Sequence, residues 1–195
     1  MSQAFRARGH ECWSCDLLPT RGDERWHYQM DILECLEKHG PFDLCIFHPP
    51  CQHLCNAGAR YWKEKQRTGV QQASIEFVLK LWRCDCPRVC IENPRGILST
   101  VWRKPDVVTS PHEHGSVYRK LTCLWTRGLP PLKKSNVRTP THTWCTNNLK
   151  SGKRKDGSRK VLLPPAAVHG SSRQRSQTDP HLARAFADQW GVNTF

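Results

Sequence analysis

The chain has 195 residues, which is enough for one hydrophobic core with insertions. Its 30 lysines and arginines against 17 acidic residues give a formal charge of +13, which favours a polyanionic partner such as nucleic acid, with a merely basic protein as the alternative. No apolar run approaches the roughly 20 residues of a membrane-spanning helix, and no secretory signal is visible. We therefore expect a cytoplasmic protein that does not bind membranes.

The chain contains 11 cysteines, scattered along its length, and without an export signal they are expected to be reduced thiols. The spacings that invite a zinc site belong to three groups: Cys12 with Cys15, Cys84 with Cys86, and His48, Cys51, His53 and Cys55. No second well-spaced pair completes a tetrahedral set, so we expect no metal centre, and a zinc-dependent nucleic-acid module remains an alternative.

The first forty residues alternate helix and strand signals. Residues 2–9 predict a short helix, and residues 11–15 predict a strand that ends at Asp16. Residues 32–39 predict a second helix, with Asp31 in position to cap its N-terminus. This alternation is typical of an α/β fold.

The apolar run 42–47 predicts a buried parallel strand, which Pro49 and Pro50 must end because proline cannot continue a β-ladder. Cys51 then lies on a stiff loop beyond the carboxyl end of the strand, where open α/β sheets place their chemistry. A buried structural cysteine in a proline-rich turn is the alternative. Residues 68–82 have helical periodicity and predict the crossover to a parallel strand over 88–92.

Three other segments carry weaker signals. Residues 61–67 mix aromatic and basic side chains, which suits a loop closing on DNA or an ordinary solvated loop. From 99 to 139 the pattern breaks into short pieces, with strand signals at 107–108 and 120–125. Residues 147–160 are glycine-punctuated and cationic, and predict a flexible loop that contacts phosphates; they include Lys153, Arg154 and Lys155.

Near the C-terminus, Thr178, Asp179 and Pro180 open a predicted helix that extends to Trp190. Its apolar side chains recur on one face, which amphipathic packing alone explains.

Two motifs resemble those of the DNA cytosine-5 methyltransferases. Residues 49–60 read Pro-Pro-Cys-Gln-x-Leu-x-x-Ala-Gly-x-Arg, similar to the nucleophile loop of the family. Residues 91–94 read Ile-Glu-Asn-Pro, similar to its second catalytic motif, with Glu92 lying 41 residues after Cys51. The His-Pro-Pro-Cys form of the loop looks closest to small family members of phages and prophages. Residues 171–175 match the Gln-x-Arg-x-Arg motif in part, with serine in place of glutamine.

The resemblance implies an α/β, Rossmann-like methyltransferase sheet, mostly parallel. We expect a catalytic core over 1–98, an irregular basic segment over 99–170 that contributes to DNA recognition, and a C-terminal helix over 171–195 that returns to the core. It further implies a monomer acting on double-stranded DNA in a bacterial cytoplasm.

The resemblance also implies the chemistry. Cys51 would add to C6 of a cytosine flipped out of the duplex, so that C5 can accept a methyl group from S-adenosylmethionine. Glu92 would hold the N3 edge of the base and Arg175 its O2. The other residues that the resemblance places at substrate or DNA are Asn93, Gln52 and Arg60.

For the methyl donor S-adenosylmethionine, the resemblance implies three contacts. Asp16 would bind the ribose, Asp31 the adenine amino group, and Pro50 would border the cofactor. The family begins with a strand and a glycine-rich loop, and no such loop precedes Asp16 here, so we expect an N-terminally truncated sheet. Two alternatives are a non-catalytic DNA-binding homologue and another covalent pyrimidine-modifying enzyme on the same scaffold.

Overall fold

A computed structural model describes residues 1–144, 166–168 and 177–191 of the chain. The α-helices are α1 (Ser2–Arg6), α2 (Ile32–His39), α3 (Trp62–Arg67), α4 (Val70–Trp82), α5 (Leu98–Val101) and α7 (Pro180–Trp190). Short 3₁₀ helices are η1 (Glu24–Trp26), η2 (Asn56–Tyr61) and η3 (Pro111–Glu113). The strands are β1 (Ser14–Asp16), β2 (His27–Gln29), β3 (Leu44–Phe47), β4 (Arg88–Asn93), β5 (Val107–Thr109), β6 (Tyr118–Arg119), β7 (Thr122–Arg127), β8 (His142–Trp144) and β9 (Ala166–Val168).

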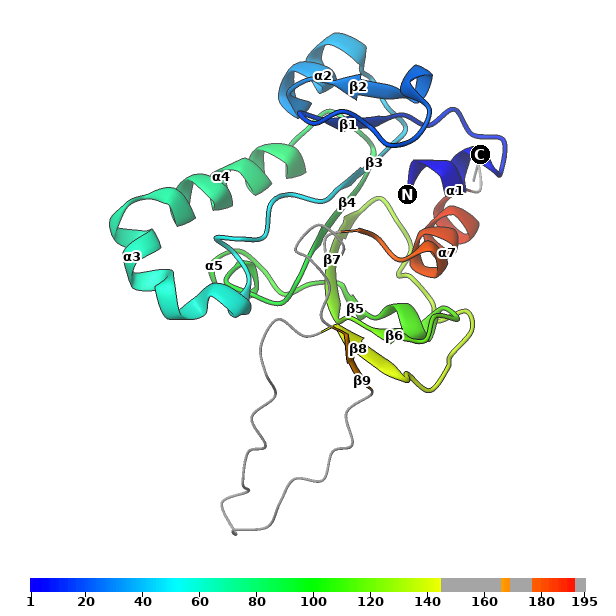
Figure 1. Ribbon diagram of the computed structural model, residues 1–195. Helices are drawn as coiled ribbons and strands as arrows, with labels where there is room; N and C mark the ends of the chain where they lie inside the picture. The colour runs from blue at the N-terminus through cyan, green and yellow to red at the C-terminus, as the bar shows by residue number, and fades with distance from the viewer. Residues whose placement is uncertain (145–165, 169–176, 192–195) are drawn as a thin grey trace.

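The central sheet has four strands in the order β3-β4-β7-β5 (Figure 1). β3 and β4 are parallel, whereas β7 runs antiparallel to both of its neighbours, β4 and β5. β1 pairs with β2 in a separate parallel sheet, and β6, β8 and β9 form a third. The described strands therefore form a mixed α/β fold with three small sheets, instead of the single, mostly parallel sheet that the sequence led us to expect.

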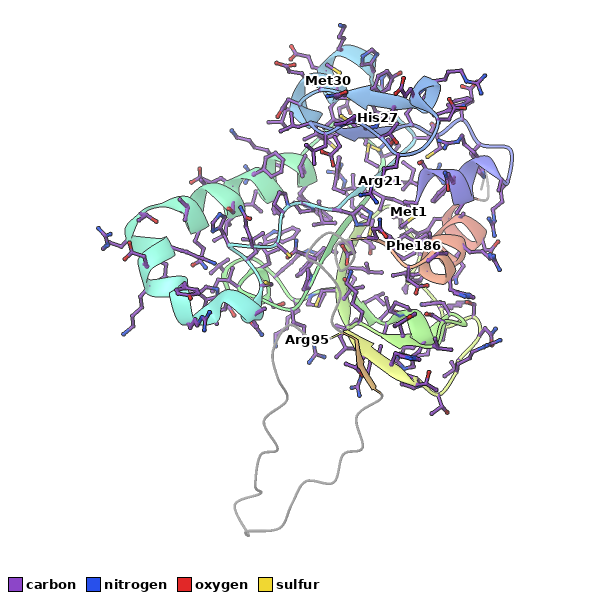
Figure 2. The ribbon with its side chains drawn as sticks, viewed as in Figure 1. Met1, Arg21, His27, Met30, Arg95 and Phe186 are labelled. Atoms are coloured by element: carbon purple, nitrogen blue, oxygen red, sulfur yellow. The ribbon has the colours of Figure 1, made fainter. Side chains whose placement is uncertain are left out.

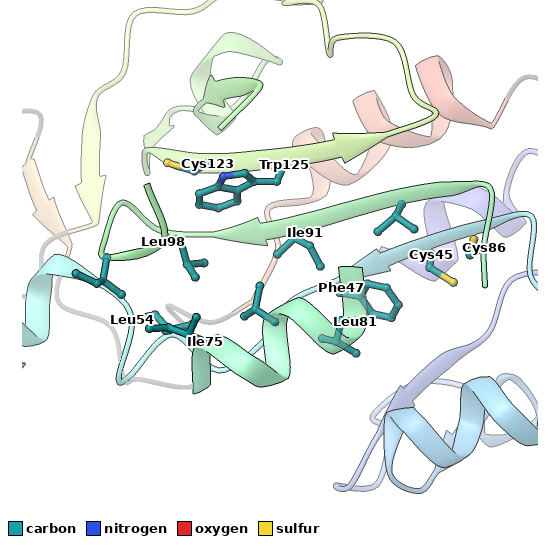
Figure 3. Close-up of a cluster of buried hydrophobic side chains, with 13 residues drawn as sticks. Cys45, Phe47, Leu54, Ile75, Leu81, Cys86, Ile91, Leu98, Cys123 and Trp125 are labelled. Atoms are coloured by element: carbon teal, nitrogen blue, oxygen red, sulfur yellow. The ribbon is translucent and has the colours of Figure 1, made fainter. Parts of the chain in front are cut away.

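Helices cover both faces of the central sheet, with α4 on one side and α1 and α7 on the other (Figure 1). Val89 and Ile91 of β4 pack with Val78 of α4 in one cluster. Figure 3 shows this cluster, with Ile91 and Trp125 labelled. Cys90, between them in β4, belongs to the second cluster with Phe186 of α7. Because successive strand residues point to opposite faces, the near-continuous apolar run of β4 serves two cores at once.

The second cluster joins the two ends of the chain. Met1 and Phe186 lie close together where α1 meets α7 (Figure 2). Trp190 is 1% exposed, and its indole N–H donates to the carbonyl of Pro130 at 3.0 Å. Asp179 caps α7 by accepting from the backbone N–H of His181, and Pro180 occupies the first turn, where its missing N–H costs nothing.

The β3-α4-β4 unit has the arrangement that the sequence indicates. Parallel neighbours need a crossover, and α4 supplies it by burying Ile75, Val78 and Leu81 against the sheet. The helix begins two residues later than predicted, because Gly69 at its N-cap has a left-handed backbone with φ of 75°.

Several sequence-based expectations are corrected: α1 ends at Arg6 instead of at Gly9, and β1 begins at Ser14 instead of at residue 11. Residues 61–67, expected to be a loop, form helix α3 from Trp62 onward, and they lacked the apolar stripe that would have indicated it. The strand expected over 42–47 begins only at Leu44; Phe42 packs against the core from the preceding turn.

The central sheet contains strands from both sides of residue 98, the expected end of the catalytic core. β3 and β4 precede this residue, whereas β5 and β7 follow it.

None of the helices that the structure describes has the length and apolar character needed to span a bilayer.

Candidate active site

Glu92 is held at the carboxyl end of β4 by two hydrogen bonds. One carboxylate oxygen accepts from Nδ1 of His48 at 3.1 Å, and the other accepts from the hydroxyl of Thr122 on β7. The Glu92 side chain is 16% exposed. Burial raises the pKa of this carboxyl, but the bond and charge of His48, the bond from Thr122 and the charge of Lys120 bring the pKa below its usual value. Glu92 is therefore a carboxylate at neutral pH, ready to accept hydrogen bonds.

The loop that carries Cys51 is fastened to the same strand end. The side-chain amide of Asn93, 1% exposed, donates to the carbonyl of Pro49 at 3.0 Å. Asn93 directly follows Glu92, and Pro49 directly follows His48. The ends of β3 and β4 are therefore joined by two side-chain hydrogen bonds just beyond their last residue pair, Phe47 with Ile91. The buried Oδ1 of Asn93 has no hydrogen-bond partner among the residues that the structure describes.

A second fastening lies beyond Cys51. Cys55 forms a β-bridge with Gly96, and the backbone N–H of Ile97 donates to the carbonyl of Leu54 at 2.8 Å. Only glycine fits at residue 96, because a Cβ atom there would lie 1.9 Å from the Leu54 carbonyl oxygen. Arg95, in the same bridging segment, is labelled in Figure 2. The loop from 49 to 55 is thus clamped at both ends to the segment that follows Glu92.

Two helices brace the middle of the loop. The side-chain amide of Gln71, buried in α4, donates to the carbonyl of His53 at 2.9 Å. Lys65 of α3 donates through Nζ to the carbonyl of Gln52 at 2.6 Å. A nucleophile on this loop is therefore placed by the scaffold rather than left to a free loop.

Cys51 is half-buried, and its thiol is hydrogen-bonded to that of Cys55. That bond, then burial, then the charges of Cys55 and Glu92 raise the pKa of Cys51. The bond from Cys51 lowers the pKa of Cys55 to about 6, and although burial opposes this, backbone N–H groups of Gly58 and Ala57 support it. The negative charge of the pair accordingly resides first on Cys55, at the start of η2.

Two hollows border this region. One, of only about 10 Å³, is lined by Glu92, Thr122, Lys120 and, from the start of α7, Asp179 and Leu182. It has room for about one water molecule and must widen before it can admit a pyrimidine. The other, of about 260 Å³, lies between the Cys51 loop and α4; among its lining residues are Pro50, Gln52, His53, Ser74 and Phe77.

Two of the residues predicted to bind S-adenosylmethionine lie at neighbouring strand ends: Asp16 ends β1 and pairs with Gln29 of the parallel strand β2, and Asp31 follows Gln29 by two residues. Asp16, the last residue of β1, is exposed and accepts from the backbone N–H of Leu18 at 2.9 Å. Asp31 caps α2, because its side chain accepts from the backbone N–H of Leu33 at 2.8 Å. This agrees with its interpretation as a helix cap. Pro50 lines the larger hollow, which neither aspartate borders. Asp16 and Asp31 thus lie at one edge of the small β1-β2 sheet, and Pro50 lines a separate hollow.

Of the remaining predicted site residues, the structure describes some and leaves others outside the described ranges. Gln52 is exposed beside Cys51, and its amide nitrogen lies 3.1 Å from Nε2 of His53. Arg60 lies over the ring of Tyr61, 4.5 Å from its centroid. Arg175, Lys153, Arg154 and Lys155 lie outside the described residues.

Sequence reasoning missed the role of three residues in the site, although it named Cys55 in a zinc-like spacing with Cys51. Thr122 and Lys120 come from a segment without a recognisable motif, so no signal could have linked them to Glu92. Cys55 could have been found, because its spacing of four residues from Cys51 is what a helical turn brings together; the backbone N–H of Cys55 indeed donates to the Cys51 carbonyl at 2.9 Å. In the described part of the chain, no group of three or more histidine, cysteine or acidic side chains is arranged to hold a metal ion.

Comparisons of the chain with protein-family models, with curated proteins and with solved structures found no match.

Proposed function

We propose that this chain activates cytosine in DNA in the manner of the DNA cytosine-5 methyltransferases, with Cys51 as the nucleophile and Glu92 as the residue that holds the base. The supporting observation is the double fastening of the Cys51 loop to the end of β4, through His48 to Glu92 and through Asn93 to Pro49. It keeps a thiol and a carboxylate at neighbouring ends of two parallel strands.

The chemistry that this arrangement suits is addition to the pyrimidine ring. A bond forms between the Cys51 sulfur and C6, the electron pair of the C5–C6 double bond moves to join C5 to C4, and the pair of the C4–N3 double bond becomes a lone pair on N3, which takes a proton. C5 then has the electron density of an enamine. Glu92 faces the N3 and amino edge, where the charge develops.

DNA is the proposed substrate because of the charge of +13, which suits a polyphosphate backbone. In a duplex, C6 is not accessible to a thiol, so the base must be flipped out, at a cost of a few kcal/mol. A monomer acting in a bacterial cytoplasm belongs to the same proposal, as do DNA contacts from Gln52, Arg60, Asn93 and the cationic segment, and a hold on O2 by Arg175.

Methylation itself requires S-adenosylmethionine to donate a methyl group to C5. The residues that we propose for the donor are Asp16 and Asp31, at one edge of the β1-β2 sheet, and Pro50. The contacts of Cys51 and Glu92 bear on base activation, which two other candidates share in part: a DNA-binding homologue without activity, and a covalent pyrimidine-modifying enzyme that uses another donor.

The test is covalent capture by DNA in which 2-pyrimidinone replaces one cytosine, because this electrophilic base adds a thiolate without any methyl donor. We expect a denaturation-stable protein–DNA adduct with the unaltered chain and none with Cys51→Ser, since a serine hydroxyl is far less nucleophilic than a thiolate. Cys12→Ser, which alters a half-buried cysteine ahead of β1, is the matched control and should retain the adduct.

The outcomes separate the candidates. An adduct that survives Cys51→Ser would refute the role of Cys51. Tight DNA binding by a well-folded chain with no adduct would favour the inactive homologue.

A further inference from the structure

His48 occupies a position that the proposed chemistry does not yet use. Its Nδ1 lies 3.1 Å from Oε2 of Glu92, and its side chain is 33% exposed. Since a carboxylate only accepts hydrogen bonds, Nδ1 must carry the hydrogen. Strand parity explains the contact: Ile46 of β3 and Cys90 of β4 pack in the same core cluster, so residues two further along, His48 and Glu92, emerge on the same face.

The addition step creates a need for a proton at this place. When Cys51 adds to C6, N3 gains an electron pair and must be protonated for the adduct to be neutral. Glu92 has a pKa below its usual value and so brings no proton of its own near neutral pH. Thr122 offers only a hydroxyl, whose proton is held far too tightly to be released. In the part of the chain that the structure describes, the side chains hydrogen-bonded to Glu92 are those of His48 and Thr122, and of these an imidazolium alone can release a proton in this range.

We propose that His48 is a positioning residue that supplies, through Glu92, the proton taken up by N3 of the base. The Nδ1–H bond of the imidazolium breaks as an O–H bond forms on Glu92, and that proton passes to N3 as the Cys51 sulfur bonds to C6. The imidazolium becomes a neutral imidazole, Glu92 ends as it began, and the thiolate charge is cancelled by the transferred proton. Reversal returns the proton to His48. The inference rests on the proposed function.

Four charged or titratable groups, from different parts of the chain, surround His48 and the path of this proton. Glu92 on β4 favours the imidazolium directly, and Asp179, ahead of α7, lines the hollow that Glu92 borders. Lys120, ahead of β7, lines the same hollow and opposes a second positive charge. Cys51, on the loop of His48 itself, interacts electrostatically with Glu92. His48 is hydrogen-bonded directly to Glu92.

The test uses exchange of the C5 hydrogen of cytosine in ordinary DNA. Reversible addition at C6 lets C5 take up deuterium from heavy water, so exchange reports base activation without a methyl donor. The rate is measured from pH ~5.5 to ~8.5, spanning the usual histidine range, for the unaltered chain and for His48→Asn. Asparagine can place an N–H near the position of Nδ1, and so keeps the hydrogen bond, but it cannot release a proton.

We expect the unaltered chain to exceed His48→Asn by about 10²-fold at the acidic end, the lower bound for general acid catalysis. The ratio should fall towards one as the pH rises through the histidine range. Taking the ratio cancels the opposing rise in thiolate, which both chains share. His39→Asn, on α2, should follow the unaltered chain throughout.

A ratio that is constant with pH, or near one everywhere, would overturn the inference, because a merely structural role of His48 gives no pH dependence of this sign. If His48→Asn is less stable by thermal melting, His48→Gln replaces it with the same expectation. Absence of exchange with the unaltered chain would instead refute the proposed base activation, so the two failures are distinct.

Discussion

At the scale of single residues, the sequence placed Cys51 and Glu92 correctly at strand ends, because proline and the apolar runs mark where β3 and β4 stop. It could not predict the contact between His48 and Glu92. That contact depends on which face each strand end presents, and an apolar run buried on both faces carries no alternation from which to determine it. The interpretation of Asp31 as a helix cap needed only local information and is confirmed.

The pairing of Cys51 with Cys55 leads to a prediction about thiol reactivity. The hydrogen bond between the two thiols lowers the pKa of Cys55 and raises that of Cys51, so the first negative charge of the pair lies on Cys55 and keeps Cys51 protonated. Cys55→Ser removes the charge and leaves a hydroxyl that can donate to a Cys51 thiolate, so the Cys51 pKa should fall. We expect alkylation of Cys51 by iodoacetamide at pH 7 to accelerate at least about tenfold, the effect of one pKa unit.

Peptide mass spectrometry measures this rate for each cysteine. In the unaltered chain Cys55 should be alkylated before Cys51, and Cys51→Ser should leave a reactive Cys55. An unchanged rate at Cys51 in the Cys55→Ser variant would show that the two thiols do not share a proton.

At the scale of elements, periodic helices were predicted well, and α2 and α4 lie within two residues of their expected bounds. Both have an apolar stripe and a marked end. Helix α3 was missed because its six residues have no such stripe and it is stabilised by what surrounds it, including the contact from Lys65 to the Cys51 loop.

The clamp between the Cys51 loop and the segment after β4 leads to a prediction at this scale. Gly96→Ala would place a Cβ atom 1.9 Å from the Leu54 carbonyl oxygen, so the two segments must separate. We expect a loss of about 1–3 kcal/mol in the free energy of unfolding, as in overpacked cores. Formation of the 2-pyrimidinone adduct should slow by about 10²-fold, because the thiol shifts away from Glu92.

Urea denaturation and adduct kinetics measure the two effects. Gly22→Ala is the control, since a Cβ atom there meets only ordinary contacts at 3.5 Å. Adduct formation at the normal rate by a Gly96→Ala chain would mean that the clamp does not position Cys51.

At the scale of the whole molecule, the sequence indicated an α/β chain with a parallel β3-β4 pair, and the structure has both. The antiparallel place of β7 between β4 and β5 could not be predicted, because strand order depends on contacts distant in sequence. β7 also carries Thr122, whose hydroxyl donates to Glu92. Because the position of β7 in the sheet could not be predicted, this residue of the site could not be predicted either. Asp16 and Asp31, both proposed for S-adenosylmethionine, lie at adjacent strand ends of the β1-β2 sheet.

The most direct test of base activation by Cys51 and Glu92 is to digest the 2-pyrimidinone adduct and locate the modified cysteine by mass spectrometry. We expect the base on Cys51, even though Cys55 is the more acidic thiol, because the loop of Cys51 is fastened to the strand end that carries Glu92. A base bonded to Cys55, or to any other cysteine of the chain, would contradict it.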